Sequence, residues 1–281
     1  MVDVRPPLPP GDWVAIPRRG RAWLWDSGPR PGAPTVVLLH GWTSTAALTW
    51  CRCFRPLARE ARVVAIDHRG HGRGIRSLEP FTLEDCADDV AALVDLLGAG
   101  PVVAAGYSMG GPVAQLLWRR HPDVVRGLVL CATAARLGAG TLPPAATQAL
   151  GIGLSLALAT VPAAVRDEGL RRLRRSGSGP HPVAPWVAAE SSYGNPVAYV
   201  QAGAATAAYD ATRWISQVDC PTAVVVTTED RTVPPLRQRT LAGAIPGAQV
   251  FEVEANHRAC VESAGRFVPA LLGAVRHAAG A

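Results

Sequence analysis

The chain has 281 residues, of which 48% are hydrophobic and 18% are charged, and its formal net charge is +6. This balance indicates a globular protein with a large core and excludes a disordered chain. The 28 basic residues are all arginine, and together with 28 glycines and 25 prolines they are typical of a GC-rich genome. Because most arginines are scattered, without a binding motif around them, the positive charge does not indicate a nucleic-acid partner.

Short apolar runs alternate with helical stretches, which is typical of a mainly parallel sheet with helices on both faces. Two early runs, residues 13–16 and 22–25, predict an antiparallel edge. Six further strands are expected at residues 35–40, 63–67, 102–108, 127–131, 222–227 and 249–253. Four of them contain continuous aliphatic runs, as strands buried on both faces do. Helices are expected at residues 83–97, 112–121 and 261–277.

Residues 136–205 contain no convincing strand and interrupt this alternation. We expect a helical cap there, inserted into a core formed by residues 1–135 and 206–281. Its apolar stretch at residues 148–161 is shorter than the roughly 20 residues of a membrane span, so a lid over an apolar pocket is favoured. An arginine run at residues 171–175, followed by a Ser/Gly/Pro hinge at 176–182, leaves weak peripheral contact with anionic lipid as an alternative.

The N-terminal residues and the cysteines point to a cytoplasmic protein. Residues 1–7 hold an acidic residue and prolines, where a secretory signal needs a basic start and an apolar stretch. The six cysteines are irregularly spaced, which fits reduced thiols better than a disulfide framework. Cys51 and Cys53 lack a second Cys or His pair at the spacing of a zinc finger, so no metal is expected.

The sequence Gly-Tyr-Ser-Met-Gly-Gly at residues 106–111 directly follows an apolar run and precedes a helical one. In this G-x-S-x-G pattern, a sharp turn between strand and helix holds the serine in a strained conformation with its hydroxyl exposed. Gly106 and Gly110 remove side chains that would collide across the turn. Ser108 is therefore the candidate nucleophile, and a glycine-rich turn with an incidental serine is the alternative.

A serine nucleophile needs a base and an acid that orients the base, and this turn motif predicts the order Ser, acid, His. Asp230 follows the strand at 222–227, and His257 follows the last strand. Both lie at the carboxyl ends of parallel strands, where open α/β sheets place their ligands. His257 is the expected base and Asp230 the expected acid. Glu229 is second choice because it lies one residue nearer the strand.

Two backbone N–H groups should bind the oxyanion. Met109 follows the nucleophile directly and supplies one of them. The loop after the strand at 35–40 supplies the other, which we assign to Trp42. Gly41 allows close approach of the backbone, and His40 is expected to brace this loop.

Five motifs in this order resemble the α/β-hydrolase family, specifically its bacterial branch with a helical cap after the sixth strand. They are the His40-Gly41 loop, the sequence DHRGHG at 67–72, the serine turn, the sequence DRTVP at 230–234, and Asn256-His257. The resemblance covers almost the whole chain and implies an eight-stranded, mostly parallel sheet. It also implies a structural role for the loop of Asp67 and Arg69, so His68 and His71 are not expected to bind metal.

The chain departs from the family pattern in two places. Thr227 stands where many relatives have glycine, and the loop at Trp42-Thr43 lacks the proline of some subfamilies. Serine at position 108, in place of aspartate, argues against haloalkane dehalogenase or epoxide hydrolase chemistry.

The resemblance implies a serine hydrolase without a cofactor, acting as a monomer or homodimer on small ester-like molecules. Carboxylic esters with apolar acyl groups are favoured because the cap is rich in Leu and Ala. Thioesters, lactones, C–C bonds and cofactor-free peroxidase chemistry all use the same triad, so they stay open. A non-catalytic protein of the same fold that binds a small ligand is the alternative outside enzymes.

Overall fold

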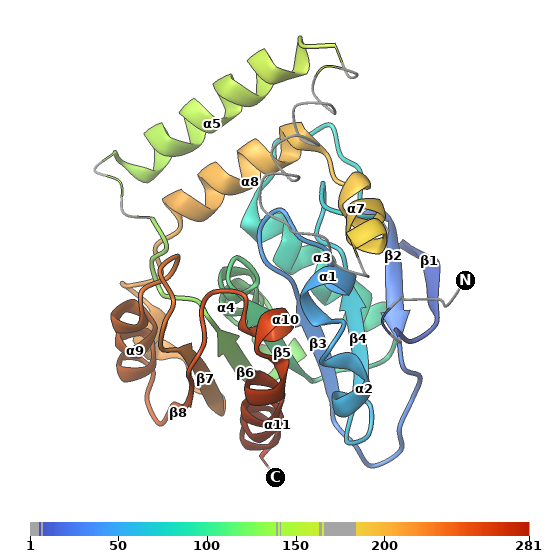
Figure 1. Ribbon diagram of the computed structural model, residues 1–281, viewed down its shortest axis with the longest axis vertical. Coiled ribbons are helices and arrows are strands. Elements are labelled where there is room, and N and C mark those ends of the chain that lie inside the picture. The colour runs from blue at the N-terminus through green and yellow to red at the C-terminus, as the bar shows by residue number, and fades with distance from the viewer. Residues whose placement is uncertain are drawn as a thin grey trace.

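The computed structural model describes residues 6, 8–138, 140, 142–162, 165 and 184–280. Eight strands form one sheet in the order β1-β2-β4-β3-β5-β6-β7-β8 (Figure 1). The strands are β1 (Gly11–Ile16), β2 (Gly20–Asp26), β3 (Thr35–Leu39), β4 (Arg62–Ile66), β5 (Val102–Tyr107), β6 (Val125–Cys131), β7 (Thr222–Thr227) and β8 (Gln249–Val253). β2 is antiparallel to both of its neighbours, and every other adjacent pair is parallel. The expected sheet with an antiparallel edge is therefore confirmed.

Alternate side chains of each central strand enter two separate cores, one on each face of the sheet. In β3, Val37 and Leu39 belong to one core, and Val36 and Leu38 belong to the other. Helices α3 (Leu83–Leu96), α4 (Gly110–Arg120) and α9 (Pro235–Ala244) contribute to the first core. Helices α1 (Ala46–Trp50), α2 (Phe54–Leu57), α10 (Ala259–Glu262) and α11 (Ala264–Ala279) contribute to the second. Two short 3-10 helices, Pro122–Val124 and Ile215–Gln217, precede β6 and β7.

The expected helix at residues 261–277 is wrong in one respect, because the chain forms two helices there. α10 ends at Glu262 and α11 begins at Ala264, and the backbone of Ser263 between them is not helical (φ −123°, ψ 35°). The helix expected at 112–121 begins earlier, at Gly110. A single break in backbone conformation leaves no trace in the apolar pattern from which the helix was expected, and helix ends shift by a residue or two.

Between β6 and β7 the chain leaves the sheet and returns to it at a narrow neck. Arg136 and Asp210 form an isolated antiparallel bridge, and the N–H of Ala211 donates to the carbonyl of Ala135 at 2.8 Å. The described part of this segment contains α5 (Pro144–Ala159), α7 (Ala184–Ser192) and α8 (Pro196–Ala208). α8 thus continues past residue 205. The arginine run at 171–175 and the hinge at 176–182 lie outside the described residues.

α8 lies between α5 and the rest of the protein (Figure 1). Gly151 of α5 packs so closely on α8 that a Cβ there would lie 2.2 Å from the Cβ of Ala204. The side-chain amide of Gln201 in α8 forms two hydrogen bonds. Its N–H donates to the hydroxyl of Ser155 in α5 at 2.8 Å, and its oxygen accepts from the N–H of Phe81 at 2.8 Å. The outer surface of α5 is apolar and exposed, with relative exposures of 58–64% at Leu150, Leu154 and Leu156. None of the helices in the described part of the chain is long and apolar enough to cross a membrane.

The loop after β4 is fixed by a buried carboxylate. Asp67 accepts hydrogen bonds from the N–H groups of Ala46, at 2.7 Å, and Arg73, at 2.8 Å. Burial raises the pKa of Asp67 to about 6, against the opposing effect of these two N–H donors. In the same loop, Arg69 forms two hydrogen bonds to the carboxylate of Asp89 on α3. The structural role expected for Asp67 and Arg69 fits these contacts.

Three histidines are buried beneath α8. The Nε2 atom of His40 accepts from the N–H of His68 at 2.9 Å, and the rings of these two residues are 4.3 Å apart. The ring of His71 is 5.4 Å from that of His40 and 4.7 Å from that of Tyr199 on α8. Burial lowers the pKa of His68 to about 3 and that of His71 to about 4, and it holds the pKa of His40 well below 6.5.

We therefore expect the protein to lose stability in mild acid. The unfolded chain binds protons on these three histidines below pH 6.5, whereas burial keeps all three neutral in the folded protein well below that pH. Stability is then full above pH 6.5 and falls as the pH decreases. Asp67 acts in the opposite direction, because its raised pKa favours the folded state as the pH falls through about 6, but one group opposes three.

Urea unfolding at pH 7.5, 6.5, 5.5 and 4.5 measures this dependence. The variant His68→Phe removes one of the three imidazoles. Among the described residues, the Nε2 atom of His68 has no hydrogen-bond partner, so this variant breaks no hydrogen bond of that atom. It should show a weaker dependence on pH than the wild type. A free energy of unfolding that stays constant from pH 7.5 to 4.5 in the wild type would contradict the prediction.

Candidate active site

Ser108 occupies the sharp turn between β5 and α4. Its φ of +53° lies in the left-handed region, which residues other than glycine rarely adopt. The N–H of Ser108 donates to the carbonyl of Cys131 at 2.9 Å, and the hydroxyl of Thr133 donates to the carbonyl of Ser108 at 2.9 Å. The backbone on both sides of the serine is thereby tied to the end of β6. The strained turn expected from the sequence is present.

Three glycines allow this turn to pack. A Cβ on Gly106 would lie 2.2 Å from the carbonyl oxygen of Gly110, and a Cβ on Gly110 would lie 2.2 Å from the carbonyl oxygen of Leu39 in β3. A Cβ on Gly111 would lie 2.2 Å from the hydroxyl oxygen of Thr133. The first of these contacts crosses the turn, as expected. The other two hold the start of α4 against β3 and the segment after β6.

The structure brings Ser108, Asp230 and His257 together at the carboxyl ends of the parallel strands. The Nε2 atom of His257 is 3.0 Å from the hydroxyl oxygen of Ser108, and its Nδ1 atom is 2.7 Å from Oδ2 of Asp230. Because a carboxylate only accepts hydrogen bonds, Nδ1 carries the proton in this pair, and Nε2 is left to accept from the serine hydroxyl. Ser108 and His257 are partly exposed, whereas the Asp230 side chain is fully buried.

The Asp230 carboxylate is held by several donors besides His257. The N–H groups of Thr232 and Val233 donate to Oδ1 at 2.8 and 2.9 Å. The hydroxyl of Thr227 donates to Oδ2 at 2.9 Å, and the side-chain amide of Gln238 donates to it at 3.2 Å. Burial alone would raise the pKa of Asp230, but the hydrogen bonds from His257, Val233 and Thr227 outweigh it, so the pKa is lowered. The carboxylate therefore stays ionised beside the imidazole.

Glu229, the second choice for the acid, directly precedes Asp230 in the same loop. Its N–H donates to the carbonyl of Ala255 at 3.0 Å, which joins the loop after β7 to the loop that carries His257. The carboxylate in contact with the imidazole belongs to Asp230. The geometry thus favours the first choice.

The loop that follows β3 lies against Ser108. A Cβ on Gly41 would be 3.4 Å from the Cβ of Ser108, an ordinary van der Waals distance, so the backbone of this loop lies directly beside the serine. His40 braces the loop, since Nδ1–H donates to the carbonyl of Gly41 at 2.7 Å while Nε2 accepts from His68. Within residues 8–138, 142–162 and 184–280, neither the Trp42 N–H nor the Met109 N–H donates to another backbone group. The assignment of these two N–H groups as oxyanion donors stays a prediction.

The sequence of this chain matches the alpha/beta hydrolase fold family over residues 34–264. The chain belongs to this family. Among its relatives, a pimeloyl-acyl-carrier protein methyl ester esterase of Chromobacterium violaceum is 30% identical over 256 residues, which cover 85% of this chain and 92% of that protein. The fold and the sequence motifs lead to the same assignment.

Two further comparisons differ in how much of each protein they cover. RutD of Caulobacter vibrioides, which is named for carbamate hydrolysis, is 36% identical over 104 residues, and this match spans only 38% of that protein and 37% of this chain. The solved structure of an esterase from Thermogutta terrifontis has a TM-score of 0.74 and 26% identity, with 95% of this chain and 98% of that chain covered. The names of these relatives thus refer to more than one kind of bond.

Several residues that support this candidate site were missed in the sequence. Gln238 is fully buried in α9 and bonds both Thr227 and Asp230. The hydroxyl of Tyr107 donates to the carbonyl of His257 at 2.9 Å and so connects the residue before the nucleophile to the histidine loop. Neither residue could be recognised from a sequence motif, because Gln238 is a single glutamine in a helix and Tyr107 is a single tyrosine in an apolar strand. The departure from glycine at Thr227 was the one available signal, and its hydroxyl is a donor to the acid.

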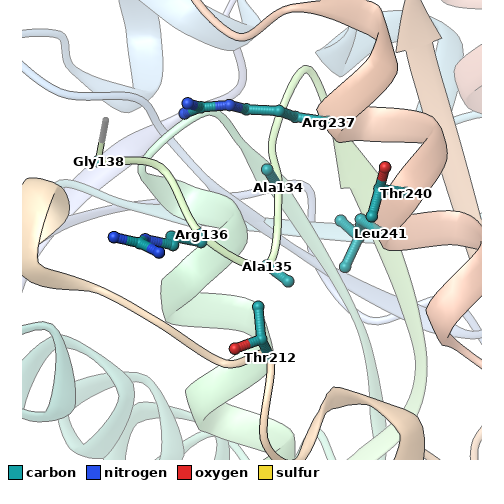
Figure 2. Close-up of a pocket in the computed structure, with 8 residues that line it drawn as sticks. All are labelled: Ala134, Ala135, Arg136, Gly138, Thr212, Arg237, Thr240 and Leu241. Carbon is teal, nitrogen blue, oxygen red and sulfur yellow. The ribbon is translucent and has the colours of Figure 1, made fainter. Parts of the chain in front are cut away.

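Two cavities of about 280 and 290 Å³ lie outside the group of Ser108, Asp230 and His257. The first lies between the segment after β6 and α9, and the guanidinium groups of Arg136 and Arg237 extend to the same side of it (Figure 2). The second lies between the loop after β4 and the beginning of α8. In the described part of the chain, no group of three or more His, Cys, Asp or Glu side chains could hold a metal ion.

We expect Thr227→Val to impair the site because it removes a donor to the Asp230 carboxylate with little change of shape. A hydrogen bond to a charged group contributes about 1.5–3 kcal/mol, and its loss also frees the carboxylate to turn away from His257. The expected result is a severalfold lower kcat/KM for ester hydrolysis and a lower free energy of unfolding.

Thr222→Val is the matched control. Thr222 lies in the same strand, is equally buried, and donates its hydroxyl to the carbonyl of Cys220 at 3.0 Å. This variant should lose stability and keep its kcat/KM. Equal kcat/KM values for the two variants would show that the hydroxyl of Thr227 does not support the acid.

Proposed function

We propose that the chain is a serine hydrolase that cleaves carboxylic esters through an acyl-enzyme on Ser108. The observation that carries this proposal is the continuous hydrogen-bonded chain from the hydroxyl of Ser108 through both nitrogens of His257 to Asp230. A relative named as a methyl ester esterase, aligned over most of both chains, supports the same class of bond.

Each residue has a role that follows from its position. His257 takes the proton of the Ser108 hydroxyl as the oxygen attacks the acyl carbon, and it then gives that proton to the departing alcohol oxygen. Water next attacks the acyl-enzyme with His257 again as the base, which releases the carboxylic acid and restores the serine. Asp230 holds Nδ1–H throughout and stabilises the imidazolium while His257 carries the extra proton.

The negative charge on the acyl oxygen needs donors that are already in place. The N–H of Met109, at the beginning of α4, and the N–H of Trp42, in the loop after β3, are the proposed pair. Each donor of this kind typically contributes about 10²–10³-fold to turnover. The dipole of α4 adds to this effect because the positive end of the helix lies beside Ser108.

We also propose that residues 136–205, with the end of α8, form a cap over this site. Its described helices α5 and α8 are rich in alanine and other apolar residues, a composition that suits small esters with apolar acyl groups. Thioesters and lactones present the same acyl carbon to the serine, and a substrate panel separates them.

Ester hydrolysis that depends on Ser108 tests the proposal first. Turnover of p-nitrophenyl esters from acetate to dodecanoate should fall by roughly 10⁶ in Ser108→Ala, because the members of a triad act as a unit. Ser192→Ala, which changes a serine in α7, should leave the rate unchanged. Intact mass after treatment with a fluorophosphonate should show one adduct on the wild type and none on Ser108→Ala. A folded wild type that takes no label and hydrolyses no ester would favour a non-catalytic ligand-binding protein.

Neighbouring acids provide a second test. Asp230→Asn should lower kcat by about 10⁴ because the amide cannot hold the imidazole in the required tautomer. Glu229→Gln makes the same chemical change one residue away and should stay within about twofold of the wild type. A larger loss in Glu229→Gln would transfer the role of the acid to Glu229.

A further inference from the structure

We infer that the indole of Trp42 positions the oxyanion-binding loop by anchoring it to α8. This inference rests on the proposed function, which makes the N–H of Trp42 an oxyanion donor. The Nε1–H group of Trp42 donates to the carbonyl of Tyr199 at 2.7 Å. The same residue would thus offer its backbone to the substrate while its side chain holds α8.

The shape of α8 fits this anchor. Gly203 lies one helical turn after Tyr199, and a Cβ there would come within 2.7 Å of the Trp42 indole. The absence of a side chain at Gly203 therefore lets the ring lie flat enough against the helix for Nε1 to reach the carbonyl. Tyr199 and Gly203 are on the same face of α8 because residues four apart in a helix are neighbours.

The loop needs an anchor because its backbone is strained. Thr43, which follows Trp42, has a φ of +55°, a conformation that costs a residue with a branched side chain about 1–3 kcal/mol. Such a conformation persists only where the surroundings fix it. Trp42 itself is 48% exposed, so burial of its ring holds the loop only in part. Its directed hydrogen bond to α8 supplies part of that restraint.

α8 is itself firmly attached to the core and is therefore a suitable support. The N–H of Asn195, at its beginning, donates to the carbonyl of Gly70 at 3.0 Å. Gln201 accepts from the N–H of Phe81, and the ring of Tyr199 packs on His71. These contacts fix α8 to the loop after β4. That loop lies at the carboxyl ends of the parallel strands, as Ser108 does. Through Trp42, α8 fixes the position of the proposed oxyanion donor.

The variants Trp42→Phe and Gly203→Ala test this inference by separate routes. The first removes Nε1–H and keeps an aromatic ring, and the second pushes the indole away while Trp42 stays intact. A displaced donor weakens the binding of the transition state more than the binding of the ester itself. We therefore expect kcat to fall about tenfold with KM nearly unchanged. Affinity for a trifluoromethyl ketone, which forms an oxyanion on Ser108, should fall by the same factor as kcat/KM.

Each variant has a matched control. Trp118→Phe removes an indole N–H that donates to Asp219 at 3.1 Å, near the C-terminal end of α4 and at the opposite end of this helix from Ser108. Gly243→Ala adds a Cβ to α9 where nothing lies within 4 Å. Neither control should change kcat or the affinity for the ketone. Thermal unfolding of all four variants shows whether a loss of activity is only a loss of structure, and Gly203→Ala still tests the inference if Trp42→Phe does not fold.

The outcomes separate this inference from the proposed function. Full kcat and full ketone affinity in both Trp42→Phe and Gly203→Ala would overturn the inference while esterase activity in the wild type stands. An increase in KM alone would also overturn it, since it would mean that the exposed indole contacts the substrate. A wild type that neither hydrolyses esters nor binds the ketone would overturn the proposed function and this inference together.

Discussion

Close packing at the turn that carries Ser108 is the constraint on which the site depends. The end of β5, the beginning of α4 and the end of β3 approach one another at distances that leave no room for a Cβ at Gly106 or Gly110. A side chain at either position would separate these elements and move the serine away from His257. Because the two hydrogen bonds of His257 span only a few ångströms, a small displacement of the turn would break the chain to Asp230. The parallel sheet supplies the rigid base for this arrangement.

Around this turn, polar groups hold loops where apolar packing cannot. The carboxylates of Asp67 and Asp230 are both buried. Asp67 accepts one N–H group from the beginning of α1 and one from its own loop, and Asp230 accepts two from the loop after β7. Their protonation differs in consequence. Burial dominates at Asp67 and raises its pKa, whereas the added donors at Asp230 lower its pKa. The same residue type thus supports a loop in one place and an imidazole in the other.

The fold was largely predictable because buried parallel strands carry continuous aliphatic runs that turns and helices interrupt. Ser108, Asp230 and His257, which lie together in the structure, could be proposed from the sequence because each follows such a strand at a characteristic motif. Thr227, Gln238 and Trp42 act through partners 3, 8 and 157 residues away in the chain, and a single sequence does not show which of its polar groups meet. The break at Ser263 was missed for a different reason, since it changes backbone direction without changing the apolar pattern of the helices on either side.

The neck between Ala135 and Ala211 affects how this protein can evolve. The chain leaves and re-enters the sheet at one paired point, so the length of the segment between these points does not affect how the strands pair. Closing a longer loop also costs little extra entropy. That segment can be lengthened, shortened or replaced while β6 and β7 stay side by side. Trp42 sets a limit to this freedom, because any replacement must again offer a carbonyl to its indole N–H.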